Sequence, residues 1–237
     1  MKIKSEDCIA CELCLPYCPM GAIKMDDVAV IDVDECVECG VCFRAGVCPG
    51  DCFVEEVHPW PRSVRATFSN PLSEHKETRV PGRGTEEMKT NDVTGVYKRG
   101  LVGMTAEMGR PGVGTRFRDV EKVAQALAKA GVKFAAQNPV TYLMVDQTTG
   151  RLNPEVLDEK VLSAMIECLV PEEKIPVVIK ELKGVAGKID TVFSLDIITK
   201  LPPDGSVPWE KIFSELGVRV SINGKNNLGL GRPLAEV

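Results

Sequence analysis

Nine of the ten cysteines lie between Cys8 and Cys52, at spacings that could bind iron. The first group follows C-x2-C-x2-C-x3-C directly before Pro19, and its members are Cys8, Cys11, Cys14 and Cys18. Two-residue spacers let a turning backbone present neighbouring thiolates to the irons of an iron–sulfur cluster. A disulfide framework would be typical of a secreted chain, but "MKIKSEDCIACELC" has no apolar segment of a secretory signal. The crowded cysteines therefore indicate a metal site, and we expect a cytoplasmic protein.

A second cysteine group repeats the first at an offset of 28 residues. It consists of Cys36, Cys39 and Cys42, with Cys48 before Pro49 in the place that Cys18 has before Pro19. Five residues rather than three separate Cys42 from Cys48, which we interpret as a slightly enlarged loop.

With these two groups, residues 1–57 resemble the bacterial dicluster ferredoxins over about a quarter of the chain. The resemblance implies two [4Fe–4S] clusters that carry single electrons at low potential. The ligands that it implies for cluster I are Cys8, Cys11, Cys14 and Cys48, and those for cluster II are Cys36, Cys39, Cys42 and Cys18.

Two alternatives concern these cysteines. Cys52 aligns with Ala22 in the repeat, so we interpret it as a small buried residue, although it could replace Cys48 as a ligand. Structural zinc normally takes two separated C-x2-C pairs. The unbroken C-x2-C-x2-C that occurs twice here favours iron–sulfur clusters over zinc.

Short apolar segments must position the cysteine loops. Ile3 precedes the first loop and the strand-like segment 28–33 separates the two, which predicts a small α+β domain over residues 1–57. So small a domain has little apolar core, and bound metal must supply much of its folding free energy. Residues 58–92 contain four prolines and no sustained periodicity, which predicts an irregular linker. Its aromatic residues and both histidines, His58 and His75, favour an arm packed on the protein over a free tether.

Residues 93–237 are predicted to form a second α+β domain. The expected helices are 118–131, 154–169, 172–185 and 208–217, and the expected strands or extended segments are 93–108, 132–146, 190–201 and 218–222. Cys168 is expected in the core, on the apolar face of the helix over 154–169. Two β–α–β units suggest a ferredoxin-like, split β–α–β sandwich, an architecture that need not bind a cluster.

A glycine-rich segment between a predicted strand and a predicted helix is a candidate anion site in this domain. Its residues are Arg110, Gly112, Gly114, Thr115 and Arg116, with Arg118 in the same helix start. Backbone amides at a helix N-terminus and nearby guanidinium groups could bind phosphate or carboxylate. The alternative is a structural turn that Thr115 caps. The spacing matches neither a dinucleotide fingerprint nor a P-loop.

The charge differs between the two parts of the chain. Residues 1–57 have a net charge of −8 and the remainder has +3. The acidic part should attract basic partners at rates that fall as salt rises. The sequence contains neither a basic stripe for nucleic acid nor an apolar run that could span a membrane.

Three functions fit these observations. The first is an electron-transfer protein or subunit that serves a partner oxidoreductase, with the second domain docking on that partner or forming oligomers. The second is a self-contained reductase whose residues 83–118 help to form a substrate site. The third is a redox-linked sensor of a small anion. The lack of a recognisable catalytic constellation in the sequence favours the first.

Overall fold

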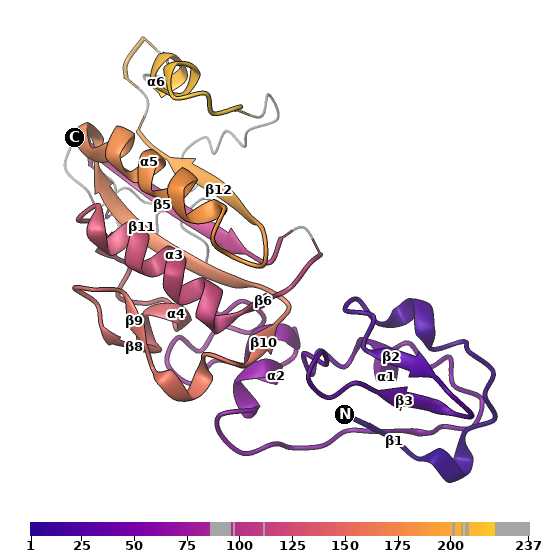
Figure 1. The fold of residues 1–237 in the computed structure, drawn as a ribbon. Coiled ribbons are helices and arrows are strands. Elements are labelled where there is room, and N and C mark those ends of the chain that lie inside the picture. The colour runs from indigo at the N-terminus through magenta and orange to yellow at the C-terminus, as the bar shows by residue number, and fades with distance from the viewer. Residues whose placement is uncertain are drawn as a thin grey trace.

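The computed structural model describes residues 1–85, 96, 98–110, 112–200, 202–204, 206 and 209–220. The N-terminal segment, residues 1–57, lies at one end of the molecule, and a sheet covered by helices lies at the other (Figure 1). Each part has its own cluster of buried apolar side chains. The chain mixes helices and strands, so the predicted α+β class is confirmed.

Short antiparallel strands build the N-terminal segment. Its elements are β1 (Lys2–Ile3), β2 (Ile23–Met25), β3 (Ala29–Ile31), α1 (Val41–Arg44) and β4 (Phe53–Val54). Strand β1 pairs with β4, and β2 pairs with β3. Ile3, Ile23 and Phe53 make a small apolar cluster in which Cys14 and Cys52 are also buried. The strands therefore hold the two cysteine loops around a minimal core.

The second part is built on a four-stranded antiparallel sheet in the order β12-β5-β11-β7. These strands are β5 (Leu101–Met108), β7 (Lys133–Phe134), β11 (Ala164–Pro171) and β12 (Phe193–Ile198). Helix α3 (Phe117–Lys129) connects β5 to β7, and α5 (Ile175–Ala186) connects β11 to β12. Both helices lie over the same face of the sheet (Figure 1). Each β–α–β unit thus encloses a strand of the other unit, which is a split β–α–β arrangement.

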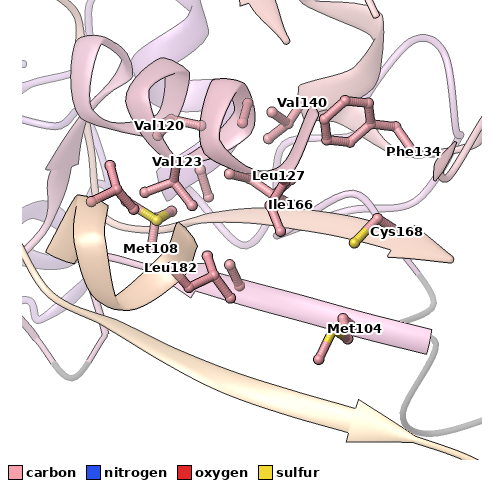
Figure 2. Close-up of a cluster of buried hydrophobic side chains, with 14 of the residues drawn as sticks. Met104, Met108, Val120, Val123, Leu127, Phe134, Val140, Ile166, Cys168 and Leu182 are labelled. Carbon is pink, nitrogen blue, oxygen red and sulfur yellow. The ribbon is translucent and has the colours of Figure 1, made fainter. Parts of the chain in front are cut away.

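Alternation of side chains along the strands explains this core. Met104 and Met108 of β5 point to the helices, whereas Thr105 and Glu107 lie on the opposite face. Figure 2 shows the side chains that meet between sheet and helices, among them Met104, Met108, Ile166, Cys168, Val120, Val123, Leu127 and Leu182.

The predicted helix over 118–131 is confirmed as α3. Its buried residues Val120, Val123 and Leu127 follow the helical period, so one stripe faces the sheet. Gly131 follows the last helical turn with φ 74°, and its N–H bonds to the carbonyl of Ala128. This geometry requires a left-handed residue, and glycine adopts it without a steric cost.

The predicted helix over 154–169 is wrong. A short 3-10 turn (Pro154–Val156), strand β10 (Lys160–Val161) and strand β11 occupy this region. Alternate residues of β11 enter the core, and the strand pairs with β5 along its whole length. Central strand pairing overrides the helical propensity of Ala164, Met165 and Glu167. Cys168 is therefore buried as predicted, but on a strand.

Part of the predicted linker is also helical, contrary to the expectation for residues 58–92. Helix α2 (Ser63–Ser69) buries Val64 and Phe68 in the core of the sheet part. The Phe68 ring meets Phe117 edge-on at 5.1 Å and His75 at 4.8 Å. Two apolar residues four positions apart are too short a pattern to predict a helix between prolines. The described residues 58–85 are hereafter called the arm, and they are packed on the protein as expected.

The remaining elements are short. They are β6 (Thr115–Arg116), α4 (Pro139–Tyr142), β8 (Met144–Asp146), β9 (Arg151–Leu152) and α6 (Trp209–Glu215). Helices α5 and α6 and strand β12 match their predicted positions. Segment 132–146 is not wholly extended, because α4 interrupts it. Residues 218–220 form no strand, and the rest of the predicted strand, 221–222, lies outside the described residues. No described helix is long and apolar enough to cross a membrane.

Candidate metal centre

Nine cysteines line two separate pockets in the N-terminal segment. The first, which we call pocket I, is lined by Cys8, Cys11, Cys14, Cys48 and Cys52. Cys18, Cys36, Cys39 and Cys42 line the second, pocket II. Pocket II takes three cysteines from the second half of the repeat and one from the first, and pocket I takes three from the first half and two from the second. With Cys52 left aside, this is the crossed arrangement that the resemblance implies. Cys52 is the additional thiol at pocket I.

Left-handed backbone positions wrap each loop around its pocket, and they repeat with the cysteines. Ala10 (φ 54°) corresponds to Glu38 (φ 55°), and Glu12 (φ 61°) corresponds to Gly40 (φ 68°). Such φ values are uncommon for residues other than glycine, so the loop fold imposes them. Gly40 was a visible sequence signal for this turn, whereas Ala10, Glu12 and Glu38 gave none.

Backbone amides donate to sulfur at matching positions of the two halves. The N–H of Ala22 lies 3.2 Å from Cys18 Sγ, and the N–H of Cys52 lies 3.4 Å from Cys48 Sγ. The Cys52 amide lowers the pKa of the Cys48 thiol. Burial, reinforced by the contact with Cys48, raises the pKa of Cys52 to about 12. Cys48 is thus the sulfur held in the same way as Cys18, and Cys52 takes the place of Ala22.

Burial disfavours the ionised form of three thiols at pocket II. Burial, and then the charge of neighbouring Cys39, raise the pKa of Cys42 to about 12. Burial likewise raises the pKa of Cys36 and of Cys39. Thiolates gathered this closely require positive charge between them, which iron ions supply when they bind. The donor set thus fits an iron–sulfur cluster in chemistry and number. Among the described residues no three His, Cys, Asp or Glu side chains converge on a single-ion site.

The arm holds the loop that carries the pocket II cysteines. Arg65 is buried, and its Nη1 donates to the carbonyls of Val33, Asp34 and Cys36 at 3.0, 2.9 and 2.8 Å. Its Nε is also ion-paired with Glu159, next to β10. One guanidinium therefore joins the N-terminal segment, the arm and the sheet part.

Glu35 makes a second link between the two parts of the chain. Its carboxylate pairs with Lys160 and, at 3.0 Å, with Arg116, residues that lie opposite each other in the β6–β10 pair. The hydrogen bond from Lys160 is the main reason that the pKa of Glu35 is lowered. Met20 also packs on Gly114, where an added Cβ would lie 2.7 Å from the Met20 sulfur.

The arginines of the predicted anion site have partners within the chain. Arg116 binds Glu35 and the Asp158 carbonyl, and Arg110 lies 3.7 Å from Glu107. Thr115 does not cap α3, because its hydroxyl donates to the carbonyl of Arg116.

The first amides of α3 are engaged as well. The N–H groups of Phe117 and Arg118 bond to the carbonyls of Glu159 and Leu157. Gly112 and Gly114 adopt left-handed conformations in the turn before the helix. The described groups of this segment therefore bind other parts of the same chain. The segment is a structural turn before α3, but its N-cap residue is Arg116 and not Thr115.

The two histidines differ in their surroundings. His75 is buried, and its Nε2 lies 3.1 Å from the carbonyl of Gly82, while burial lowers its pKa. His58 lies 3.3 Å from Glu38 in the loop of pocket II. Both pack within the arm or against it, as the sequence indicated.

Comparison with known proteins identifies the class of the N-terminal segment. Residues 1–24 match the model of the 4Fe-4S binding domain. The chain is similar to Ferredoxin Fdx2 of Sorangium cellulosum, with 41% identity over 61 residues that make up 25% of this chain and 60% of that protein. It is also similar to Ferredoxin-3 of Chlorobaculum tepidum, with 38% identity over 58 residues, 22% of this chain and 90% of that protein. No solved structure matches the chain.

The N-terminal segment is thus an iron–sulfur domain of the 4Fe–4S type. Through it, the chain belongs to the ferredoxins. The resemblance inferred from the cysteine spacing is confirmed.

Proposed function

We propose that this protein transfers single electrons through two [4Fe–4S] clusters, one at each pocket, to or from a partner oxidoreductase. The observation that carries the proposal is the crossed cysteine arrangement, with three thiols from one half of the repeat and the fourth from the other at both pockets. This is the ligand pattern of two-cluster ferredoxins.

The proposed ligands follow from the pockets. Cys8, Cys11, Cys14 and Cys48 bind the cluster at pocket I, and Cys36, Cys39, Cys42 and Cys18 bind the cluster at pocket II. When bound, each cluster supplies a one-electron carrier whose potential depends on charge, hydrogen bonds and burial. The chain itself contributes amides that donate to the sulfurs of Cys18 and Cys48.

The proposal assigns the chain two functional parts. The N-terminal domain, residues 1–57, holds both clusters. The sheet part is a ferredoxin-like sandwich, and its support is the strand order β12-β5-β11-β7 with two β–α–β units. The arm belongs with the sandwich because Val64 and Phe68 lie in its core. We propose that this part holds the redox domain in a fixed position and contributes to docking on the partner enzyme.

The self-contained reductase and the anion sensor are less well supported. Binding of a small molecule at Arg110, Arg116 or Arg118 would favour either of them. Arg116 already binds Glu35, and the first amides of α3 bond to backbone carbonyls.

Native mass spectrometry of the anaerobically purified protein tests the two-cluster count. The expected mass excess over the polypeptide is that of about eight irons and eight sulfides, and an excess of half that amount would refute it. Purification of the tagged protein from its own cells tests the second part of the proposal. A stoichiometric oxidoreductase should accompany it, whereas a bound small molecule without a protein would favour the reductase.

A further inference from the structure

The two halves of the repeat differ sharply in exposure, although their backbones match. Ile9 is 68% exposed, whereas its counterpart Val37 is 2% exposed. Cys11 is exposed, whereas its counterpart Cys39 is buried. The loop at pocket I therefore faces solvent, and the equivalent loop at pocket II is covered.

The cover at pocket II comes from the arm and the chain start. Glu38, at the centre of that loop, accepts hydrogen bonds from Arg62 at 2.6 Å and from the Met1 amino group at 2.5 Å. Arg65 binds three carbonyls of the same loop, and the sheet part binds Glu35 next to it. Described residues beyond residue 57 also make hydrogen bonds and ion pairs to the N-terminal segment. None of these interactions involves a residue that lines pocket I.

The exposed loop has the chemistry of a docking surface. Ile9 and Leu13 expose apolar side chains on either side of Cys11 in the sequence, and Leu13 is 53% exposed. The carboxylates of Glu6 and Glu12 lie on the same exposed stretch of chain. An apolar centre with a charged rim is typical of transient protein interfaces, in which the charges steer the encounter.

We propose that electrons enter and leave the protein only at this loop, residues 6–13, which we call the exchange face. Its occupant is a redox protein with an apolar patch ringed by lysine and arginine. The arm covers the equivalent loop at pocket II and denies it to such partners, so its cluster exchanges electrons through the cluster at pocket I. This inference rests on the proposed function, because it assumes a cluster at each pocket.

Stopped-flow oxidation of the reduced protein by cytochrome c, a basic haem protein, tests the exchange face. In the reaction one electron passes from the reduced protein to the ferric haem, and haem absorbance records it. Reversing one charge at about 8 Å from a cationic partner in water corresponds to a rate that is about fivefold lower at low salt. We therefore expect Glu12→Lys to slow the reaction about fivefold at low ionic strength and little at high ionic strength.

Glu173→Lys is the matched control, since it makes the same charge change at an exposed site in the sheet part. It should leave the rate within twofold of the parent. At high salt, Ile9→Ser should still slow the reaction several-fold, whereas Val177→Ser, at an exposed position of α5, should not.

Equal effects at the exchange face and at the control sites would overturn the inference. So would a dimer in sedimentation velocity that Ile9→Ser dissociates, because the face would then belong to a second copy. Iron content separates this failure from that of the proposed function. A protein with both clusters but no preference for the exchange face refutes the inference alone.

Discussion

Arg65 offers the most direct test of how the redox segment is held. We consider Arg65→Met, which keeps much of the side-chain volume and removes the guanidinium. Arg65 is 4% exposed, so solvent cannot replace its partners without rearrangement. The substitution leaves the Glu159 carboxylate without its buried counter-charge and leaves carbonyls of Val33, Asp34 and Cys36 without donors.

The expected cost follows from these lost contacts. Removing one member of a buried ion pair typically costs about 3–5 kcal/mol, because the remaining charge is uncompensated. Each carbonyl left without a donor adds up to about 1–3 kcal/mol where water cannot reach it. Since the loop can shift toward water, we expect the free energy of unfolding to fall by about 3–5 kcal/mol.

Equilibrium unfolding in urea, under anaerobic conditions, measures this change. Cluster absorbance reports on the N-terminal segment, and far-ultraviolet circular dichroism reports mainly on the sheet part. In the parent the two transitions should coincide, and in Arg65→Met the absorbance transition should come first, because the link between the parts is lost.

Arg79→Met is the control. Arg79 is exposed and pairs with Glu74, so its loss should cost less than about 1 kcal/mol. If Arg65→Met lowered the free energy of unfolding by as little as Arg79→Met, and if its two transitions still coincided, the linking role of Arg65 would be refuted.

Three further predictions address the site and the core. Iron analysis should show that Cys48→Ser loses about four irons and that Cys52→Ser loses none. Loss of iron in Cys52→Ser alone would make Cys52, and not Cys48, the ligand at pocket I. Because burial lowers the pKa of His75, the unfolded chain binds its proton more readily, and stability should fall as pH drops below about 6.5. His75→Asn should reduce that pH dependence in urea titrations, and an unchanged slope would contradict the assignment. Leu127→Ala should lower the free energy of unfolding by about 2–5 kcal/mol, since Leu127 is buried between α3 and the sheet; a loss below about 1 kcal/mol would argue against this packing.

The cysteine spacing predicted a 4Fe–4S domain, which the comparisons support, because ligand geometry is local. Two-residue spacers and the proline after Cys18 and Cys48 specify how the loop turns, whatever lies beside it. The sequence could not show that one loop is exposed and the other covered. Val37 and Ile9 are both apolar residues that directly follow a cysteine, and the contacts of the arm with the pocket II loop make their surroundings differ.

The sheet part shows where local patterns mislead. The stretch before Cys168 contains alanine, methionine and glutamate, which favour helix in isolation. Its position between β5 and β7 decides otherwise, because eight residue pairs with β5 and the alternate burial of its side chains require an extended strand. Helix α3 was predictable because two signals indicate the same helix. Its apolar residues follow the helical period, and Gly131 marks its C-terminal end.

The structure gives the arginines of the candidate anion site partners within the chain. A glycine-rich turn with arginines does gather positive charge, and that part of the argument was sound. The anion that Arg116 binds is the carboxylate of Glu35, one residue before a cysteine that lines pocket II. Of the arginines that suggested a ligand site, Arg116 thus holds the redox domain on the sheet part. An acidic N-terminal segment beside a slightly basic remainder is the composition that such an internal contact requires. The same charge difference leaves the carboxylates of the exchange face available to a basic partner.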